Sequence, residues 1–180
     1  MYCNSSGETL ADTKIKIDVG CGANCKPGFL GIDREKWTSD VKYKCDFEHE
    51  KLPFKNSTVD SAYCCHVLEH LDNPMSLVDE VYRVLKPHGD FVIRVPHYSY
   101  PASHVMNHKN YWSFHCKQHF DGGYHEYTKW SKVNFVGKFA NSNGFIEKIL
   151  GFLLKKHPFA YETFLSNFYP IAEIEISLVK

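Results

Sequence analysis

Short apolar runs separated by turn residues dominate the first half of this chain. Five runs have the length and the β-branched or aromatic content of strands, at 15–19, 29–33, 41–46, 59–65 and 91–95. Between the last two, Asn73 and Pro74 open a helix that ends near Lys86-Pro87-His88-Gly89, because apolar residues recur there at helical spacing. This alternation of strand and helix predicts crossover connections and a mostly parallel sheet.

The second half of the chain has weaker patterns. We interpret Val133, Val136, Phe139 and Ala140 as part of a helix and the apolar run 145–154 as a strand. The tail at 171–179 alternates between apolar and polar residues, which is typical of a strand with one buried face. At 180 residues the chain is long enough for a sizeable core, so we expect a single domain over 1–180.

The most informative stretch joins the first two predicted strands. Gly20 and Gly22 allow backbone conformations, and a close approach of a ligand, that a Cβ atom would block. Asp33 ends the second strand, where a carboxylate can accept hydrogen bonds from both hydroxyls of a ribose. The order of strand, glycine turn, strand and acid therefore predicts a nucleoside-binding edge of an α/β sheet.

A dinucleotide site is the nearest competing interpretation of this stretch. Its G-x-G-x-x-G pattern requires a third glycine where this chain has Cys25, and a helix whose amino end faces a pyrophosphate. The residues Lys26-Pro27-Gly28 follow at once and leave room for one helical turn at most. The loop therefore suits a nucleoside without phosphates.

These residues resemble the first motif of the class I S-adenosylmethionine-dependent methyltransferases, (D/E)-x-G-x-G, which Asp18, Gly20 and Gly22 match. The resemblance implies that Asp18 and the turn Gly20-Cys21-Gly22 face the methionine part of S-adenosylmethionine, and that Asp33 holds its ribose. It also implies an α/β fold of the Rossmann-like, three-layer type. Its mainly parallel seven-stranded sheet would include an antiparallel C-terminal strand.

Later segments extend the resemblance over most of the chain. Asp46 and Phe47 match the position after the third strand, where the family uses a carboxylate for the adenine amino group and the next residue for the ring. The segments H-V-L-E-H-L at 66–71 and L-K-P-H-G at 85–89 resemble the ubiquinone-methyltransferase-like branch. In that arrangement the main chain of His66 is expected near the reactive methyl group.

Composition and charge narrow the range of functions. Basic and acidic residues number 21 each, so no basic field favours nucleic acid or an anionic membrane. No window reaches the roughly 18 apolar residues of a membrane span, and the first ten residues lack a signal-peptide pattern. The N/D-P-P-Y motif of methyltransferases acting on nucleic-acid bases is also missing. We therefore expect a cytoplasmic enzyme that methylates an oxygen or nitrogen atom of a small molecule.

The seven cysteines do not indicate a disulfide framework, because their number is odd and Cys64 and Cys65 are adjacent. Cys21 and Cys25 lack a second pair at the distance that a structural zinc site requires. Free thiols that pack as small hydrophobic groups are the expected state.

Residues 96–130 form the second region where chemistry is expected. They hold six of the eleven histidines among many aromatic residues, and a connection of this length is more often functional than idle. Because they follow the fifth strand, we expect them above the carboxyl edge of the sheet, facing the substrate. His97, and after it His108, are the predicted acceptors of a proton from the attacking oxygen or nitrogen.

Metal binding is the competing interpretation of these histidines. The pairs His104/His108 and His115/His119 have i, i+4 spacing, which would put both rings of a pair on one face of a helix. However, the H-E-x-x-H pattern is missing and Pro101 weakens a helix there, so the sequence assigns no metal.

Two departures from the family leave room for a partner. A short loop replaces the helix after the glycine turn, and about fourteen residues precede the first strand. One edge of the cofactor would then be open, to be covered by a second copy of the chain, a partner subunit or the aromatic segment. Two other functions stay open at this point: a cofactor-binding but inactive partner subunit, and a nicotinamide-dependent oxidoreductase.

Overall fold

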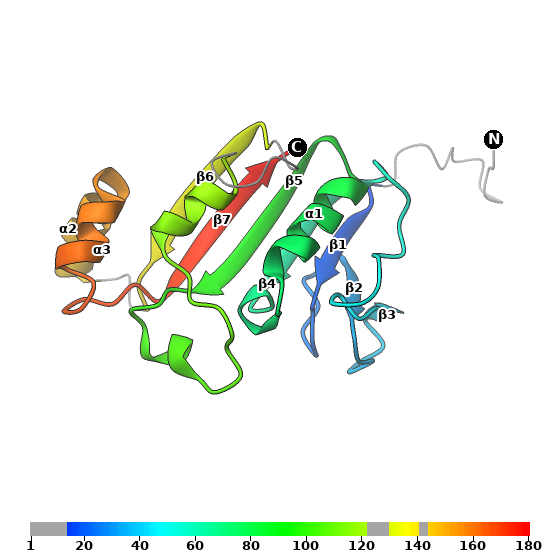
Figure 1. The fold of residues 1–180 in the computed structure, drawn as a ribbon, viewed down its shortest axis with the longest axis horizontal. Helices are drawn as coiled ribbons and strands as arrows, with labels where there is room; N and C mark the ends of the chain where they lie inside the picture. Colours follow the sequence, from blue (N-terminus) through cyan, green and yellow to red (C-terminus); the bar gives the residue numbers. More distant parts are fainter. Residues whose placement is uncertain (1–13, 122–129, 141–143) are drawn as a thin grey trace.

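A single seven-stranded sheet organises the computed structural model, which describes residues 14–121, 130–140 and 144–180 (Figure 1). The strand order is β3-β2-β1-β4-β5-β7-β6. The strands are β1 Lys16–Val19, β2 Leu30–Asp33, β3 Val41–Lys44, β4 Val59–Cys65, β5 Leu85–Pro96, β6 Lys132–Lys138 and β7 Glu173–Val179. The pairs from β3 to β5 are parallel, and β7 runs antiparallel to both β5 and β6. The predicted Rossmann-like sheet with an antiparallel C-terminal strand is thereby confirmed.

Within the described residues, three α-helices and three short 3-10 helices accompany the sheet. They are α1 Pro74–Val84, α2 Phe145–Lys156, α3 Pro158–Phe164, η2 Leu68–His70, η3 Pro101–His104 and η4 Phe114–His119. Helix α1 begins as predicted, because the side chain of Asn73 accepts a hydrogen bond from Ser76 N–H at 3.3 Å and Pro74 fills the first turn. Among the described residues, no helix combines the length and the apolar character that a membrane crossing requires.

The main core lies between α1 and the central strands. Leu77, Val78 and Val81 of α1 are fully buried against residues such as Ile17 and Ile93. Burial of this apolar face contributes roughly 1.5–3 kcal/mol for each large aliphatic side chain. A smaller second core joins α2 and α3 to the edge of the sheet.

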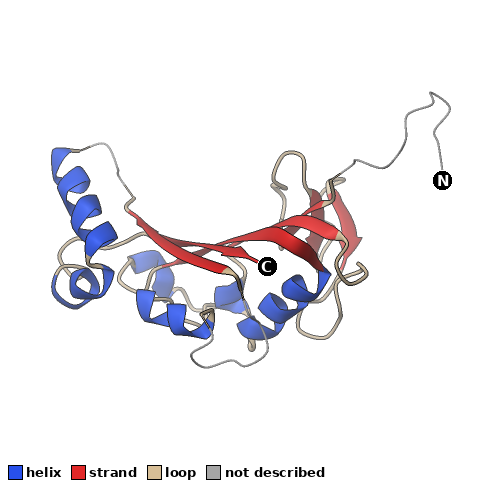
Figure 2. Ribbon diagram, turned by 90° about the horizontal axis from the view of Figure 1, so that it is seen from above, coloured by secondary structure: helices blue, strands red, loops and turns tan. Residues whose placement is uncertain are grey.

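The described helices leave one face of the sheet without a helical cover, so the expected three-layer arrangement is not found within the described residues (Figure 2). The short loop between Gly22 and Phe29 leaves no room for the helix that would cover this face. On that face the strands β4, β5 and β7 carry half-buried residues, whereas the residues between them are buried. Cys65, Arg94 and Glu175 stand next to one another in register and share this face. The face is therefore largely polar, unlike the apolar face under α1.

Two sequence-based predictions in the second half are wrong. The segment expected to be a helix is strand β6, where Val133, Phe135 and Gly137 pair with β7. Val133 and Phe135 also alternate with the polar Lys132 and Asn134, which is the period of a strand, and the pairing with β7 decided the outcome. The run 145–154, expected as a strand, forms α2, because Leu150 and Leu154 place one helical face on the second core.

Candidate functional site

Two cavities meet at the glycine turn, at the carboxyl ends of β1, β2 and β4. The first, of about 790 Å³, lies on the helix-free face and is lined by Asp18, Gly20, Cys21, Tyr63, Cys65 and Arg94, among others. The second, of about 420 Å³, is lined by Gly20, Asp33, Trp37, Phe47, His66 and Lys109, among others. Gly20 borders both cavities, so they adjoin at the glycine turn over the carboxyl edge of the sheet.

The glycine turn depends on both of its glycines. Gly20 has a φ of +73°, and a Cβ atom there would lie 2.2 Å from Cγ2 of Val67. Gly22 has a φ of +55° with open space around its Cα atom. Both conformations are easy for glycine alone. At Gly20, the side chain of Val67, which follows β4, is a second reason why only glycine fits.

Two buried carboxylates hold the short loop in place. Asp18 accepts a hydrogen bond from Lys26 N–H at 2.7 Å, and Asp33 accepts one from Gly22 N–H at 2.9 Å. Burial raises the pKa of Asp18, although the hydrogen bond from Lys26 opposes this shift. Asp18 and Asp33, which are expected to bind the cofactor, therefore also fix the backbone of the loop through its N–H groups.

The Asp33 carboxylate has further partners in the second cavity. Its Oδ1 accepts hydrogen bonds from Glu35 N–H at 3.1 Å and from the indole Nε1 of Trp37 at 3.2 Å. Trp37 is 63% exposed and lines the cavity. Trp37 was not predicted as a site residue; its position four residues after Asp33, in a polar loop, was the available signal.

The turn after β3 contributes an aromatic residue and an acid to the same cavity. Phe47, an expected site residue, lines this cavity. Glu48, which was not predicted, lines it as well. The carboxylate of Asp46 instead accepts hydrogen bonds from Glu48 N–H and from Nδ1 of His49, at 3.1 and 3.0 Å. Asp46 therefore shapes the turn that presents Phe47 and Glu48.

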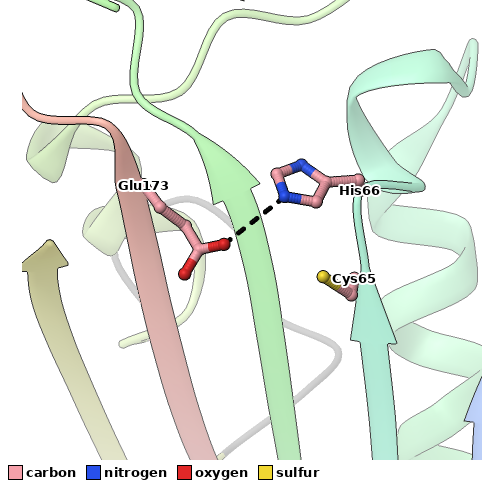
Figure 3. A group of neighbouring side chains, drawn as sticks. All are labelled: Cys65, His66 and Glu173. Atoms are coloured by element: carbon pink, nitrogen blue, oxygen red, sulfur yellow. Dashed lines mark ion pairs between the residues drawn. The ribbon is translucent and has the colours of Figure 1, made fainter. Parts of the chain in front are cut away.

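His66 occupies a strained backbone position at the second cavity. Its φ is +55°, and its N–H donates to the carbonyl of Arg94 at 2.9 Å. The ring lies between two acids: Nδ1 is 3.1 Å from Glu69 Oε1, and Nε2 is 3.4 Å from Glu173 Oε2 (Figure 3). Hydrogen bonds with its neighbours, foremost Cys65 and then Glu173, raise the pKa of His66 to about 12.

Basic side chains compete for the acids at the start of β7. Glu173 lies 3.4 Å from Nε of Arg94 and 3.9 Å from Nζ of Lys138. Glu175 pairs with the same two cations, at 3.0 Å to Arg94. The carboxylates beside Cys65 are thus already neutralised by fixed positive charges.

The segment after β5 returns over the carboxyl edge, as expected. The main-chain N–H groups of Lys109 and Asn110 donate to the carbonyl of Glu69, at 2.7 and 3.1 Å. Asn107 and Lys109 line the second cavity. The part of this segment at 122–129 lies outside the described residues.

His97 does not open onto either cavity. Its side chain is fully buried; Ser99 N–H donates to its Nδ1 at 3.1 Å, so Nε2 carries the proton and donates to Glu162 Oε1 at 2.8 Å. Both ring nitrogens are therefore engaged. Glu162, on α3, also accepts from Phe114 N–H, so this pair fastens α3 and η4 to the end of β5.

His108 lies beside the post-β4 turn. Its Nδ1 is 3.0 Å from the carbonyl of Ser103, and its ring centre is 4.7 Å from that of His70. Of the i, i+4 partners, His104 contacts the carbonyl of Tyr98 and His115 lies 3.8 Å from Glu162.

Converging metal-ligand atoms occur in two groups within the described residues: Cys65, His66 and Glu173, and Glu69, His70 and His108. Neither group contains both histidines of an expected pair. The described cysteines are all free, in agreement with the sequence analysis, and burial raises the pKa of Cys21 to about 12.

The comparisons with known sequences point to one family. Residues 22–93 match the model of a methyltransferase-domain family. A sterol 4-C-methyltransferase of Caenorhabditis elegans is 32% identical over 88 residues, which cover 47% of this chain and 25% of that protein. A demethylmenaquinone methyltransferase of Protochlamydia amoebophila is 27% identical over 95 residues, covering 48% and 39% of the two chains. The chain thus spans well under half the length of these relatives.

Solved structures share the fold over nearly the whole chain. A methyltransferase from Archaeoglobus fulgidus, described as dependent on S-adenosylmethionine, has a TM-score of 0.65 at 17% identity, covering 93% of this chain and 86% of that one. A complex of the Haloferax volcanii Trm112 methyltransferase activator with a putative methyltransferase gives a TM-score of 0.59 at 16% identity, covering 93% and 83%. Residues 22–93 of this chain therefore match a methyltransferase-domain family, and the chain shares its fold with S-adenosylmethionine-dependent methyltransferases.

Proposed function

We propose that this chain binds S-adenosylmethionine across the two cavities that meet at Gly20 and transfers its methyl group to an acceptor. The adenosine part would occupy the cavity of about 420 Å³, between Asp33 and Phe47. The methionine part would extend into the cavity that Asp18 and Cys21 line. The observation that carries the proposal is this meeting of two cavities at a glycine without a side chain, because the cofactor itself has two parts of different chemistry.

We assign the ribose to the carboxylate of Asp33. An ionised carboxylate offers about four acceptor sites, and three are used by Gly22 N–H, Glu35 N–H and the Trp37 indole. The Trp37 side chain is largely exposed, so a ribose hydroxyl can replace it without unfolding the loop. Asp18 is different, since its buried carboxylate orients the loop through Lys26 N–H.

The reaction needs little covalent chemistry from the protein. The sulfonium of S-adenosylmethionine makes the methyl group electrophilic, so the chain mainly aligns the acceptor atom with the methyl carbon and sulfur and excludes water. The proposed acceptor is an oxygen or nitrogen atom of a small molecule. The balanced charge of the chain, with 21 basic and 21 acidic residues, supports a small molecule over a nucleic acid.

The segment at about 96–130 is proposed to face the acceptor within a single domain over 1–180. Asn107 and Lys109 of this segment border the second cavity. His108, the second predicted proton acceptor, is kept as part of the proposed acceptor site. The engaged ring nitrogens of His97 favour positioning of the segment over proton transfer, so we place His97 behind the acceptor site.

A second copy of the chain, or a partner subunit, is proposed to cover the helix-free edge of the cofactor. The first cavity lies on this face, where Cys65, Arg94 and Glu175 are half-buried and polar. A solved chain of the same fold is paired with a methyltransferase activator, which supports looking for such a partner here.

Calorimetric titration with S-adenosylmethionine tests the cofactor site through Asp33→Asn. Loss of hydrogen bonds to a charged acceptor should weaken binding at least about tenfold. The control is Asp40→Asn, an exposed aspartate of the same loop, which should bind as the native chain does. Unchanged affinity in Asp33→Asn would remove Asp33 from the ribose site.

Transfer itself is tested by offering labelled methyl donor to fractionated metabolites. Label in a small molecule is expected. If S-adenosylmethionine binds but no label moves in any fraction, the chain is a cofactor-binding partner subunit instead of an enzyme.

A further inference from the structure

The turn after β4 and the connection after β5 bring two histidines and a glutamate together. Glu69 and His70 belong to η2, and His108 lies 38 residues further along the chain. Each of the three offers one ligand atom, and these atoms all lie within 4.8 Å of one another. Nothing in the methyl transfer proposed above requires this convergence.

The two imidazoles are held in the form that metal ligands need. Nδ1 of His70 is 3.1 Å from the carbonyl of Asn107, and Nδ1 of His108 is 3.0 Å from the carbonyl of Ser103. A carbonyl oxygen only accepts, so each Nδ1 carries a proton, and in the neutral ring the lone pair is then on Nε2. Metal-binding histidines are commonly oriented in this way, by donating the other ring N–H to a backbone carbonyl.

The glutamate supplies a buried negative charge with spare capacity. The side chain of Glu69 is fully buried, and only its Oε1 has a partner, the His66 ring at 3.1 Å. Its Oε2 is buried without a hydrogen-bond partner among the described residues. An unpartnered oxygen of this kind is costly unless something binds it. A cation next to Glu69 would satisfy it.

We propose that Glu69, His70 and His108 form a binding site for a divalent transition-metal ion, with Zn²⁺ as the best fit. Two neutral imidazoles and one carboxylate are a known ligand set for zinc, with a fourth position left for water or another ligand. Ligands of tetrahedral zinc at 2.0–2.1 Å lie about 3.3 Å apart, so small side-chain rotations close the site. His70 also borders the second cavity, which brings the fourth position close to it.

The other converging group is a weaker candidate for a metal. Around Cys65, the ring of His66 is already bonded through both nitrogens to Glu69 and Glu173. Arg94 and Lys138 also lie within 4 Å of Glu173 and would repel a cation. Near the proposed site, Lys109 is paired with Asp72 at 2.7 Å. The His66 ring, whose pKa is raised, also lies 3.1 Å from Glu69 Oε1, but its charge is shared with Glu173, and Oε2 of Glu69 has no partner among the described residues.

The test is calorimetric titration of the untagged, chelator-treated full chain with Zn²⁺. One ion per chain is expected. His108→Ala and His70→Ala should each weaken binding at least about tenfold, since loss of an outer partner alone costs that much. The matched control is His104→Ala, which removes a histidine of the same connection that lies outside the group. Circular dichroism confirms that each variant is folded. Glu69→Gln removes the negative charge of the glutamate while the shape of the side chain stays nearly unchanged.

Co²⁺ substitution identifies which group holds the ion. Ligation by nitrogen and oxygen alone predicts visible bands without the near-ultraviolet band of a thiolate ligand, and an unchanged spectrum in Cys65→Ser. A thiolate band that Cys65→Ser abolishes would overturn the proposal. Equal Zn²⁺ affinity in the native chain, His70→Ala and His108→Ala would overturn it as well. Titration with S-adenosylmethionine, run in parallel, keeps failure of this site distinct from failure of the proposed function.

Discussion

At the scale of single residues, His97 shows how burial changes the meaning of a motif. It directly follows the Val95-Pro96 end of β5, where the sequence analysis expected a proton acceptor. The hydrogen bonds to Ser99 and Glu162 leave it no free lone pair. Its partner Glu162 lies 65 residues away along the chain, and such a long-range pairing leaves no local pattern in the sequence.

We therefore expect His97→Ala to act on stability. Removing the hydrogen-bond donor of a buried carboxylate should cost about 1.5–3 kcal/mol in the free energy of unfolding, measured by urea denaturation. Adding Glu162→Gln should recover part of the loss, because the uncompensated charge is gone. Native stability in His97→Ala combined with lost turnover would restore the proton acceptor assigned from the sequence.

Gly20 combines two constraints that a pair of variants can separate. Gly20→Ala should destabilise the fold, through the clash with Val67 and through a positive φ that costs a non-glycine residue roughly 1–2 kcal/mol. In a Val67→Ala background, the effect of Gly20→Ala should shrink to the backbone cost alone. Equal destabilisation in both backgrounds would show that the contact with Val67 is unimportant. Thermal unfolding supplies the measurement.

At the scale of elements, the first half of the chain follows its pattern and the second half does not. Strands β1 to β5 and helix α1 were predicted because each combines an apolar run with clear turn or capping residues, as at Asn73 and Pro74. Residues 132–138 and 145–156 lack such boundaries. Their structures follow from pairing with β7 and from packing of Leu150 and Leu154, which a short apolar run does not reveal.

An ion pair joins the beginnings of three strands and makes stability depend on pH. Asp60 of β4 accepts from Lys86 Nζ at 2.7 Å and from Ile15 N–H at 2.8 Å, and the bond from Lys86 foremost lowers its pKa below the usual 3.8. Its stabilisation is therefore complete above the unfolded-state pKa and is lost as the pH falls through the folded-state value.

Asp60→Asn should accordingly lower the unfolding free energy by about 1 kcal/mol at neutral pH. The difference from the native chain should disappear in acid, well below pH 4, because the side chain at position 60 is then neutral in the native chain as well as in the variant. Urea denaturation across this range measures it. A difference that stays constant down to acid pH would mean that the charge of Asp60 contributes nothing.

At the scale of the whole molecule, the helix-free face is the feature that the sequence indicated only through a short loop. The few residues between Gly22 and Phe29 leave no room for a helix, so the loss of cover could be anticipated. The polar character of the face could not, because it results from the register of β4, β5 and β7. The metal-ligand group could not be predicted from the sequence either, because Glu69 and His108 come together only in the folded chain.

If a second copy of the chain covers the helix-free face, the chain should form a dimer in solution. Light scattering after size-exclusion chromatography should give twice the chain mass at high protein concentration if a second copy provides the cover. Glu175→Arg, which places a second cation beside Arg94 on this face, should then reduce the mass to that of one chain. A single-chain mass at all concentrations would exclude the homodimer and leave a different subunit as the proposed partner.

The central claim is that one molecule of S-adenosylmethionine occupies the two cavities around Gly20. Its most direct test is calorimetric titration of the native chain with S-adenosylmethionine and, separately, with NAD⁺. The account predicts saturable binding of one S-adenosylmethionine per chain and no comparable binding of NAD⁺. Tight binding of NAD⁺ without any binding of S-adenosylmethionine would contradict it.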